Sequence, residues 1–299
     1  APRKIDKATG KATGGELTVN IEAFTCMKNE QQILLTPTEF RILVFLMKSP
    51  RQIFTKNQLQ WMSSPIPLDV AERFYRAWRA SGIVEVVSHA SYLINLASHD
   101  PVLWKRSVEA LTYEAQRCLD LGIGLLVFHP GHHGGAGYQV GMEWLERGIQ
   151  QVLEAIPLGV RLLLEPSAGQ GTLVGFVLKD CVELCHRIGY ERLGLCLDTC
   201  HLFAAGYDFR TPGGYDRLLR SLGDRGTRLV GCWHLNDSKD PKGSRKDRHQ
   251  RVGIGTIGLA PFQMILSDPR FHAVPAIVEA PPSTVAEDLA LLNKLMGLG

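Results

Sequence analysis

Short apolar runs recur along most of the chain, and stretches with helical periodicity separate them. Each run has the length of a strand that is buried on both faces of a parallel sheet. The alternation of strand and helix, with a crossover helix between successive strands, predicts an α/β fold. The predicted strands are residues 52–55, 83–87, 123–128, 160–164, 193–197, 229–235 and 274–278, and the predicted helices include 104–121, 140–155, 176–188 and 215–222.

The number of strands indicates a barrel that lacks its usual beginning. Seven strands follow residue 51, whereas a (β/α)8 TIM-type barrel of about 250 residues has eight. We therefore predict a TIM-type barrel over residues 53–299 whose first βα unit is replaced by the segment before it. A strand at 17–24 and a helix at 38–47 are the candidates for the replacement, and a second short strand is predicted at 31–35.

The first 52 residues differ in character from the barrel sequence. Residues 1–15 are basic and rich in Gly and Thr, and we predict a flexible arm, with contact to DNA as the alternative. In residues 16–52, strand-like stretches precede a helix that Thr36 caps and Pro37 begins. This segment resembles the start of a winged-helix effector domain of the response-regulator type. It stops before any recognition helix, so we do not expect it to bind DNA by itself.

The composition is that of a large, nearly neutral globular protein. Its 299 residues are 45% hydrophobic, with a net charge of +3 and a pI near 8.5, so any basic surface for nucleic acid would have to be local. The seven cysteines form no C-x-x-C pair, which indicates reduced thiols in the core. No apolar run reaches the ~20 residues that cross a bilayer, and no signal peptide is visible. We expect a soluble, cytoplasmic protein without a membrane partner.

Six of the predicted strands end at a residue type that binds metal ions. The apolar run at 193–197 shows the pattern, because Asp198 follows it directly and His201 comes shortly after. The carboxyl ends of parallel strands gather on one face of a barrel, so these side chains are expected to lie together. The loop 236–255 adds two more ligand types. The nine candidates are His89, His129, Glu165, Asp198, His201, His234, Asp247, His249 and Glu279.

These candidates indicate a metal centre with several ions. Four carboxylates and five imidazoles on one face would be unfavourable without cations, because like charges would crowd and their desolvation would be uncompensated. A mixture of imidazole and carboxylate suits zinc best, with manganese or iron next. Nine ligands exceed the needs of one ion, so two or three ions are predicted. Such a cluster, with an activated water, suits the hydrolysis of a phosphoester.

Seven motifs in residues 53–299 resemble those of the endonuclease IV family, the metal-dependent apurinic/apyrimidinic (AP) endonucleases of DNA repair. The family's fold is a (β/α)8 barrel with a trinuclear zinc site, which agrees with the fold predicted above. The motifs lie at residues 54–58 with Trp61, 89–96, 128–131, 165–171, 196–208, 234–239 and 247–258.

The resemblance implies three zinc ions and assigns the nine candidates to them, with Glu165 shared between two. Mn2+ or Fe2+ is the alternative to Zn2+. Carried over by motif, the first ion would take His89, His129 and Glu165, the second Glu165 as a bridge with Asp198, His234 and Glu279, and the third His201, Asp247 and His249.

The resemblance also implies a reaction. The substrate is double-stranded DNA with an abasic site, and hydrolysis of the phosphodiester 5′ to that site gives a 3′-hydroxyl and a 5′-deoxyribose phosphate. Glu165 is the implied catalytic residue, which orients or deprotonates the attacking water. The protein is expected to act as a monomer.

Three groups of residues are candidates for contacts to DNA. The first matches a wedge loop of the family, although a leucine stands where the family often has arginine. The second matches a motif that enters the minor groove beside the abasic nucleotide, with packing at the barrel rim as the alternative. The third lies in a basic loop suited to phosphates, with a merely solvated loop as the alternative. In that order, the residues are Gln58, Leu59 and Gln60; Tyr92 and Leu93; and Lys239, Arg245 and Arg248.

Three other interpretations of the sequence remain open. A metal-dependent sugar isomerase or epimerase would use the same kind of barrel with fewer ligands. A DNA-binding regulator would use residues 16–60. The third is a chimera with an impaired site, because the family's first strand and helix are absent and the two kinds of sequence meet at residues 53–58. Metal stoichiometry and the cleavage of abasic DNA separate the isomerase from the endonuclease, and deletion of residues 1–50 tests the regulator.

Overall fold

The structure is a computed structural model of the chain. It divides into two compact units, Ala1–Met62 and Ser63–Gly299, and each is described by itself. The residues that the structure describes are 4–6, 11–14, 17–20, 25–28, 31–33, 66–279 and 283–297.

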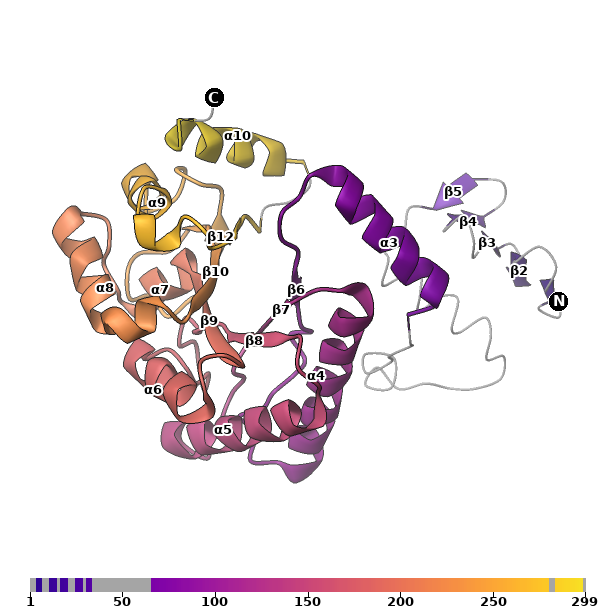
Figure 1. Cartoon of the computed structure of the whole chain (residues 1–299), viewed down its shortest axis with the longest axis horizontal. Coiled ribbons are helices and arrows are strands. Elements are labelled where there is room, and N and C mark those ends of the chain that lie inside the picture. The colour runs from indigo at the N-terminus through magenta and orange to yellow at the C-terminus, as the bar shows by residue number, and fades with distance from the viewer. Residues whose placement is uncertain are drawn as a thin grey trace. The chain divides into compact units, whose positions relative to one another are not determined.

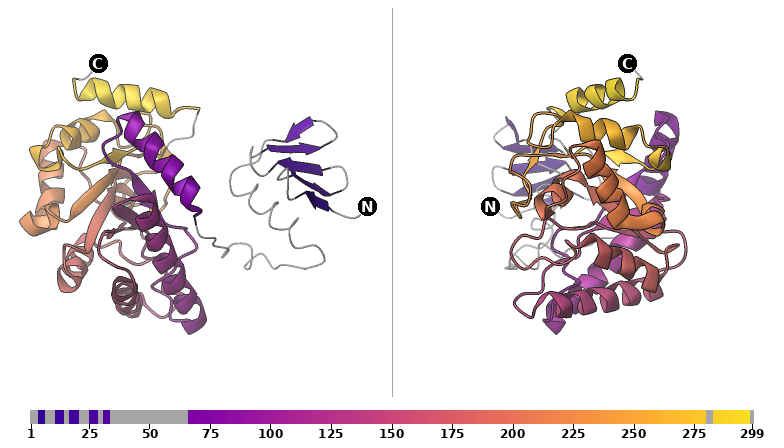
Figure 2. Two further views of the ribbon diagram at one scale, coloured as in Figure 1. Left: turned by 45° about the vertical axis from the view of Figure 1, so that its right-hand side comes forward. Right: turned by 90° about the vertical axis from the view of Figure 1, so that its left-hand side faces the viewer.

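The first unit contains a five-stranded antiparallel sheet in which each strand pairs with the next along the chain (Figure 2). Strands β3 and β5 fall inside the strands predicted at 17–24 and 31–35. Strands β1 and β2 lie within residues 1–15, for which a flexible arm is predicted. Sheet pairing uses backbone N–H and C=O groups, which a sequence rich in Gly and Thr also carries. The strands are β1 Lys4–Asp6, β2 Lys11–Gly14, β3 Leu17–Asn20, β4 Thr25–Lys28 and β5 Gln31–Ile33.

Other predictions for the start of the chain lie outside the described residues. They include the helix at 38–47 and the strand at 52–55. The resemblance of residues 16–52 to a winged-helix domain gains no support. The replacement of the first βα unit by this segment therefore stays a prediction.

The second unit is built on a curled parallel sheet of six strands in the order β13-β10-β9-β8-β7-β6 (Figure 1). Each strand overlaps one of the predicted apolar runs. The predicted α/β class and TIM-type barrel are confirmed, and within the described residues β6 and β13 are the edges of the sheet. The strands are β6 Val87–His89, β7 Leu125–Phe128, β8 Arg161–Leu164, β9 Leu193–Asp198, β10 Val230–His234 and β13 Ala276–Ile277.

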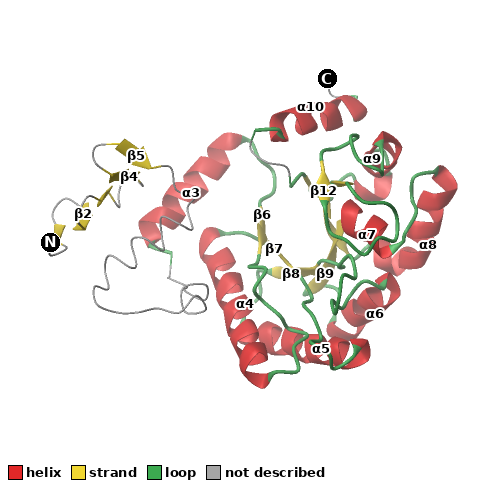
Figure 3. Cartoon of the chain, turned by 180° about the vertical axis from the view of Figure 1, so that it is seen from behind, coloured by secondary structure: helices red, strands yellow, loops and turns green. Residues whose placement is uncertain are grey.

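Helices surround the curled sheet on its outer side, as the view from behind shows (Figure 3). The longest of them, α4, has clear end signals: Asp100 accepts hydrogen bonds from Val102 N and Leu103 N, and Gly122 ends the helix in the left-handed conformation. Within the described residues, no helix combines the length and the apolar character that crossing a membrane requires. The helices are α3 Leu68–Ser81, α4 Pro101–Leu121, α5 Tyr138–Ala155, α6 Leu178–Ile188, α7 Thr199–Ala205, α8 Pro212–Thr227, α9 Leu259–Leu266 and α10 Val285–Leu295, with a short 3-10 turn, η1 Pro269–Phe271.

A layer of apolar side chains fills the barrel interior directly below the predicted ligands. Val127, Leu163, Cys196 and Cys232 are fully buried and pack together, with Val87 and Ile277 against them. Each stands two residues before a predicted metal ligand, and side chains two apart in a strand point to the same face. The strands therefore turn their last side chains toward the barrel axis. These ligands are His89, His129, Glu165, Asp198, His234 and Glu279.

Candidate metal centre

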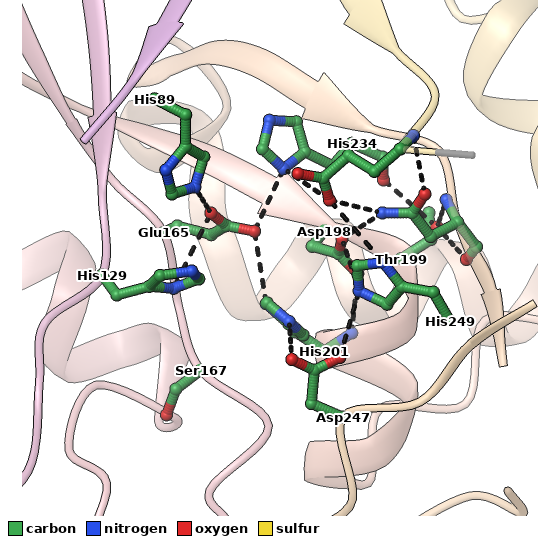
Figure 4. Close-up of polar contacts among 12 residues, drawn as sticks. His89, His129, Glu165, Ser167, Asp198, Thr199, His201, His234, Asp247 and His249 are labelled. Carbon is green, nitrogen blue, oxygen red and sulfur yellow. Dashed lines mark hydrogen bonds and ion pairs between the residues drawn. The ribbon is translucent and has the colours of Figure 1, made fainter. Parts of the chain in front are cut away.

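Glu165 lies at the centre of the site, with imidazoles on several sides (Figure 4). It follows β8, and its side chain is 1% exposed. Its Oε2 is 3.0 Å from His89 Nε2 and 3.8 Å from His129 Nδ1, and its Oε1 is 3.1 Å from His234 Nδ1 and 3.3 Å from His201 Nδ1. Four strands and the helix α7 thus deliver one carboxylate and four imidazoles to the same point.

A second group of acceptors surrounds the amide of Asn236. This side chain is 2% exposed, and its Nδ2 donates to Asp198 Oδ2 and, over 2.9 Å, to Glu279 Oε2. Its Oδ1 accepts a hydrogen bond from Glu279 N over 3.1 Å. His234 Nδ1 is 3.4 Å from Glu279 Oε2. Asn236 therefore holds two predicted ligands in place, and sequence reasoning missed it, although it stands two residues after His234.

Asp247 joins two histidines on the opposite side of the site. Its Oδ2 is 3.2 Å from His201 Nε2, and its Oδ1 is 3.0 Å from His249 Nε2. His249 Nε2 is also 3.6 Å from Asp198 Oδ2. Asp198 has a further role, because its Oδ1 caps helix α7 by accepting a hydrogen bond from His201 N over 2.8 Å. This cap fixes where α7 begins and so where His201 lies.

The ligand atoms form compact sets that compare directly with the predicted ones. Within the described residues, each set has its ligand atoms within 4.8 Å of one another. Two sets coincide with the first and second predicted ions. In the region of the third ion, Asp198 joins His201 and His249, and Asp247 joins His249 with Cys200. These sets are His89, His129 and Glu165; Glu165, Asp198, His234 and Glu279; Asp198, His201 and His249; and Cys200, Asp247 and His249.

The electrostatics of the site favour bound cations. Burial by itself would raise the pKa of Glu165, but the neighbouring imidazoles of His201, His234 and His89 outweigh it and hold that pKa well below its usual range. Burial would also raise the pKa of Glu279, but the contact with His234 outweighs burial and lowers that pKa to about 2. The carboxylates are therefore ionised at neutral pH and depend on positive charge from their neighbours.

Two imidazole nitrogens support this conclusion. His201 Nδ1 and His249 Nε2 are buried and make no hydrogen bond, although carboxylate oxygens lie 3.3 Å and 3.0 Å from them. A metal ion between such a nitrogen and such an oxygen would satisfy both atoms. The residues present fit a zinc centre.

The residues predicted to contact DNA differ in their exposure to solvent. Tyr92 is 78% exposed and Leu93 is half-buried in the loop after β6. Lys239 and Arg248 are exposed, and Arg248 Nη1 donates to the carbonyl of Asp247 over 2.7 Å. The three residues of the first wedge loop, Gln58, Leu59 and Gln60, lie outside the described part of the chain.

Arg245 makes its contacts within the protein. Its guanidinium lies 4.2 Å from the centre of the Phe176 ring, and its Nη1 is 3.5 Å from the carbonyl oxygen of Gly169. It also has a positive φ of 55°, which is uncommon for a residue with a side chain. Arg245 thus joins the loop after β8 to the loop after β10, in addition to any contact it makes with DNA.

Comparison with known proteins agrees with this geometry. A family described as "xylose isomerase-like TIM barrel" matches residues 51–295. A protein of Chloroflexus aurantiacus named "probable endonuclease 4" is 45% identical over 253 residues, which are 82% of this chain and 88% of that protein. The chain belongs to the endonuclease IV family. Another protein of that name, from Geobacter sulfurreducens, is 40% identical over 83% of this chain and 85% of its own length.

Solved structures support the same assignment. The crystal structure of endonuclease IV from Thermus thermophilus matches with a TM-score of 0.70 and 31% identity, over 80% of this chain and 86% of that one. A D-tagatose 3-epimerase-like protein matches with a TM-score of 0.59 and 16% identity, over 77% of this chain and 83% of that one. At that identity the second likeness concerns the barrel alone. The predicted membership of the endonuclease IV family is confirmed.

Proposed function

We propose that the chain is an AP endonuclease that hydrolyses the phosphodiester 5′ to an abasic site in double-stranded DNA. The products would be a 3′-hydroxyl and a 5′-deoxyribose phosphate. The observation that supports this most is the buried Glu165 among four imidazoles, in a chain 45% identical to a protein named "probable endonuclease 4".

The ligand sets would hold up to three divalent ions, with Zn2+ expected and Mn2+ or Fe2+ as alternatives. When bound, such ions polarise phosphoryl oxygens and make water a nucleophile at neutral pH. Asn236 would orient two of the carboxylates through its amide. The residues that would hold the ions are His89, His129, Glu165, Asp198, His201, His234, Asp247, His249 and Glu279.

Glu165 is the proposed catalytic residue. Its lowered pKa keeps the carboxylate ionised, so it can accept a hydrogen bond or a proton from the attacking water. Burial at 1% exposure limits competing contacts with solvent. Hydrogen bonds from imidazoles on both carboxylate oxygens fix its orientation relative to the phosphate.

Exposed residues at the rim would bind the DNA. Tyr92, 78% exposed, is suited to insert beside the abasic nucleotide, with Leu93 next to it. Lys239 and Arg248 would contact backbone phosphates, and Arg245 would support their loop. Gln58, Leu59 and Gln60 are proposed to complete the contact.

The oligomeric state and the cellular location are also part of the proposal. All nine proposed ligands come from one chain, so the centre needs no second subunit and we propose a monomer. We also propose a cytoplasmic location, which the bacterial origin of the relatives named "probable endonuclease 4" supports.

An incision assay tests the proposal. The substrate is a short duplex with one abasic site, incubated with purified protein, with protein treated with chelator, and with treated protein given zinc again. We expect incision that chelator abolishes and zinc restores, with a 3′ end that a DNA polymerase extends. The same duplex without the abasic site is the control. Absence of incision by zinc-loaded protein, together with turnover of a ketose, would instead assign a sugar epimerase.

A further inference from the structure

The carboxylate of Asp237 is completely buried, and backbone groups of a distant loop surround it. The side chain is 0% exposed and stands three residues after His234. Its Oδ1 accepts hydrogen bonds from two backbone N–H groups, and its Oδ2 accepts from three. The donors are Ser238 N at 2.7 Å, Ile257 N at 2.9 Å, Gly253 N at 3.0 Å, Gly255 N at 3.0 Å and Gly258 N at 3.3 Å.

These hydrogen bonds close the loop that carries two of the proposed ligands. Strands β11 Asp237–Ser238 and β12 His249–Gln250 pair antiparallel, and Lys239 N donates to the carbonyl of Arg248 over 2.9 Å. After β12 the chain turns back, and backbone N–H groups of residues 253–258 donate to the Asp237 carboxylate. Asp247 and His249 lie within the closed loop, so its geometry determines where they are.

The loop leaves no space between itself and the carboxylate. A Cβ on Gly255 would lie 2.3 Å from Asp237 Oδ1 and 2.4 Å from the carbonyl oxygen of Ser238. Such distances are far below van der Waals contact, so only glycine allows this approach. Backbone and carboxylate therefore fit each other as a preformed unit.

We propose that Asp237 is a positioning residue that holds Asp247 and His249 ready for the third metal ion. This inference rests on the proposed function of the site. Its two oxygens already accept five hydrogen bonds, so Asp237 is not itself a ligand. The hairpin β11–β12 forms a sheet separate from the six-stranded one, so the loop that carries Asp247 and His249 is paired apart from the barrel strands.

The test is a zinc titration of the full-length metal-free protein, with bound zinc per chain measured by elemental analysis after dialysis. In Asp237→Asn, an NH2 group replaces one acceptor oxygen and faces N–H donors. We expect the zinc concentration that fills the last site to rise about 10–100-fold, the usual effect of removing a supporting partner, while the other sites fill as in the wild type.

A matched control and a reference variant accompany this titration. Asp240→Asn makes the same change in the same loop, where the side chain contacts only Lys246 Nζ, at 3.3 Å, among the described residues; it is expected to titrate as the wild type does. His249→Ala identifies the zinc ion that the loop binds. If His249→Ala loses no zinc, or if Asp237→Asn titrates as the wild type does, the proposal is overturned.

Two further measurements keep the test decisive. If Asp237→Asn does not fold, Gly255→Ala disturbs the same contact from the loop side. If Gly255→Ala then binds zinc as the wild type does, the proposal is overturned. Incision of abasic DNA by Asp237→Asn should recover at high zinc, which a globally misfolded protein would not show. Zinc binding needs no DNA, so the two proposals can fail separately. If the wild type never incises abasic DNA but Asp237→Asn still needs more zinc to fill its last site, the endonuclease function is refuted and the positioning role of Asp237 is retained.

Discussion

Two buried carboxylates near the carboxyl ends of the strands have opposite surroundings. Glu165 faces imidazoles, whereas Asp237 faces backbone N–H groups. Backbone donors are fixed, neutral and always protonated, so they satisfy Asp237 within the protein. Imidazoles are common metal ligands, so the surroundings of Glu165 suit bound cations. The type of partner thus separates a functional carboxylate from a structural one.

Replacing Glu165 with glutamine is expected to reduce incision by roughly 10²–10⁴-fold, the usual contribution of a general base. The amide keeps the volume of the side chain but removes its charge and one acceptor oxygen. The measurement is the single-turnover rate on abasic duplex at saturating zinc. Glu143→Gln, an exposed position on α5, is the matched control. A rate within a factor of about ten of the wild type would exclude the proposed role.

Replacing Asn236 with alanine is expected to weaken zinc binding at the second site by about 10–100-fold. The amide donates to Asp198 and Glu279, and without it these two carboxylates repel each other with no donor between them. Competition with a chromogenic zinc chelator measures the affinity. Asn293→Ala, at an exposed position of α10, should behave as the wild type does. An unchanged affinity in Asn236→Ala would contradict the supporting role of the amide.

At the scale of elements, the strands could be predicted because both of their faces are buried. A run such as Leu193–Asp198 is buried at every position, and burial on both faces of a strand produces a short, almost continuously apolar sequence. The candidate ligands at the strand ends are visible in the sequence for the same reason, because polar residues interrupt these runs where the barrel opens.

Helix α3 and the hairpin β11–β12 were not predicted, for different reasons. Helix α3 has no buried residue, so it lacks the buried stripe that marks most surface helices. The sequence feature that marks this helix is the presence of oppositely charged residues four positions apart, such as Asp69 and Arg73. The hairpin depends on Asp237, whose donors in the closing segment lie 16 to 21 residues further along the chain. Contacts between such distant positions leave no local periodicity.

One pair of elements allows a prediction about pH. Asp268, 6% exposed, accepts hydrogen bonds from Tyr215 Oη over 2.9 Å and from Arg270, and so ties α8 to the turn η1. Burial would raise the pKa of Asp268, but the Arg270 and Tyr215 contacts outweigh it and lower that pKa. A lowered pKa in the folded state stabilises the fold above the unfolded pKa of about 3.9, and this stability is lost as the pH falls through the folded value.

Asp268→Asn is therefore expected to lower the free energy of unfolding at pH 7 by roughly 1–3 kcal/mol. The difference from the wild type should stay constant from about pH 7 to about pH 5 and narrow as the pH is lowered further toward about 3. Urea unfolding at a series of pH values measures both effects, and Asp224→Asn, exposed on α8, is the control. A difference that stays constant down to about pH 3 would show that the charge of Asp268 is not what stabilises the contact.

At the scale of the whole molecule, the sequence indicates where the barrel pattern begins but not which segment pairs with the edges of its sheet. The match to the family starts at residue 51. Within the described residues, the sheet has edges at β6 and β13, and β13 pairs with β10 through Ala276 and Ile277 only. Edge strands present unpaired N–H and C=O groups to solvent. Which segment covers them depends on long-range pairing, and hydrophobic patterning does not encode the partner of a strand.

Removal of residues 1–50 distinguishes the possible roles of the N-terminal segment. None of the nine proposed ligands lies in it, so the truncated protein should bind as much zinc per chain as the full-length protein. If the segment covers an edge of the sheet, truncation should lower the unfolding temperature and increase light scattering at a fixed concentration, because exposed strand edges associate. A truncated protein that keeps its zinc and its unfolding temperature but loses all binding to DNA would instead indicate that the segment is a DNA-binding module and that the barrel does not bind DNA alone.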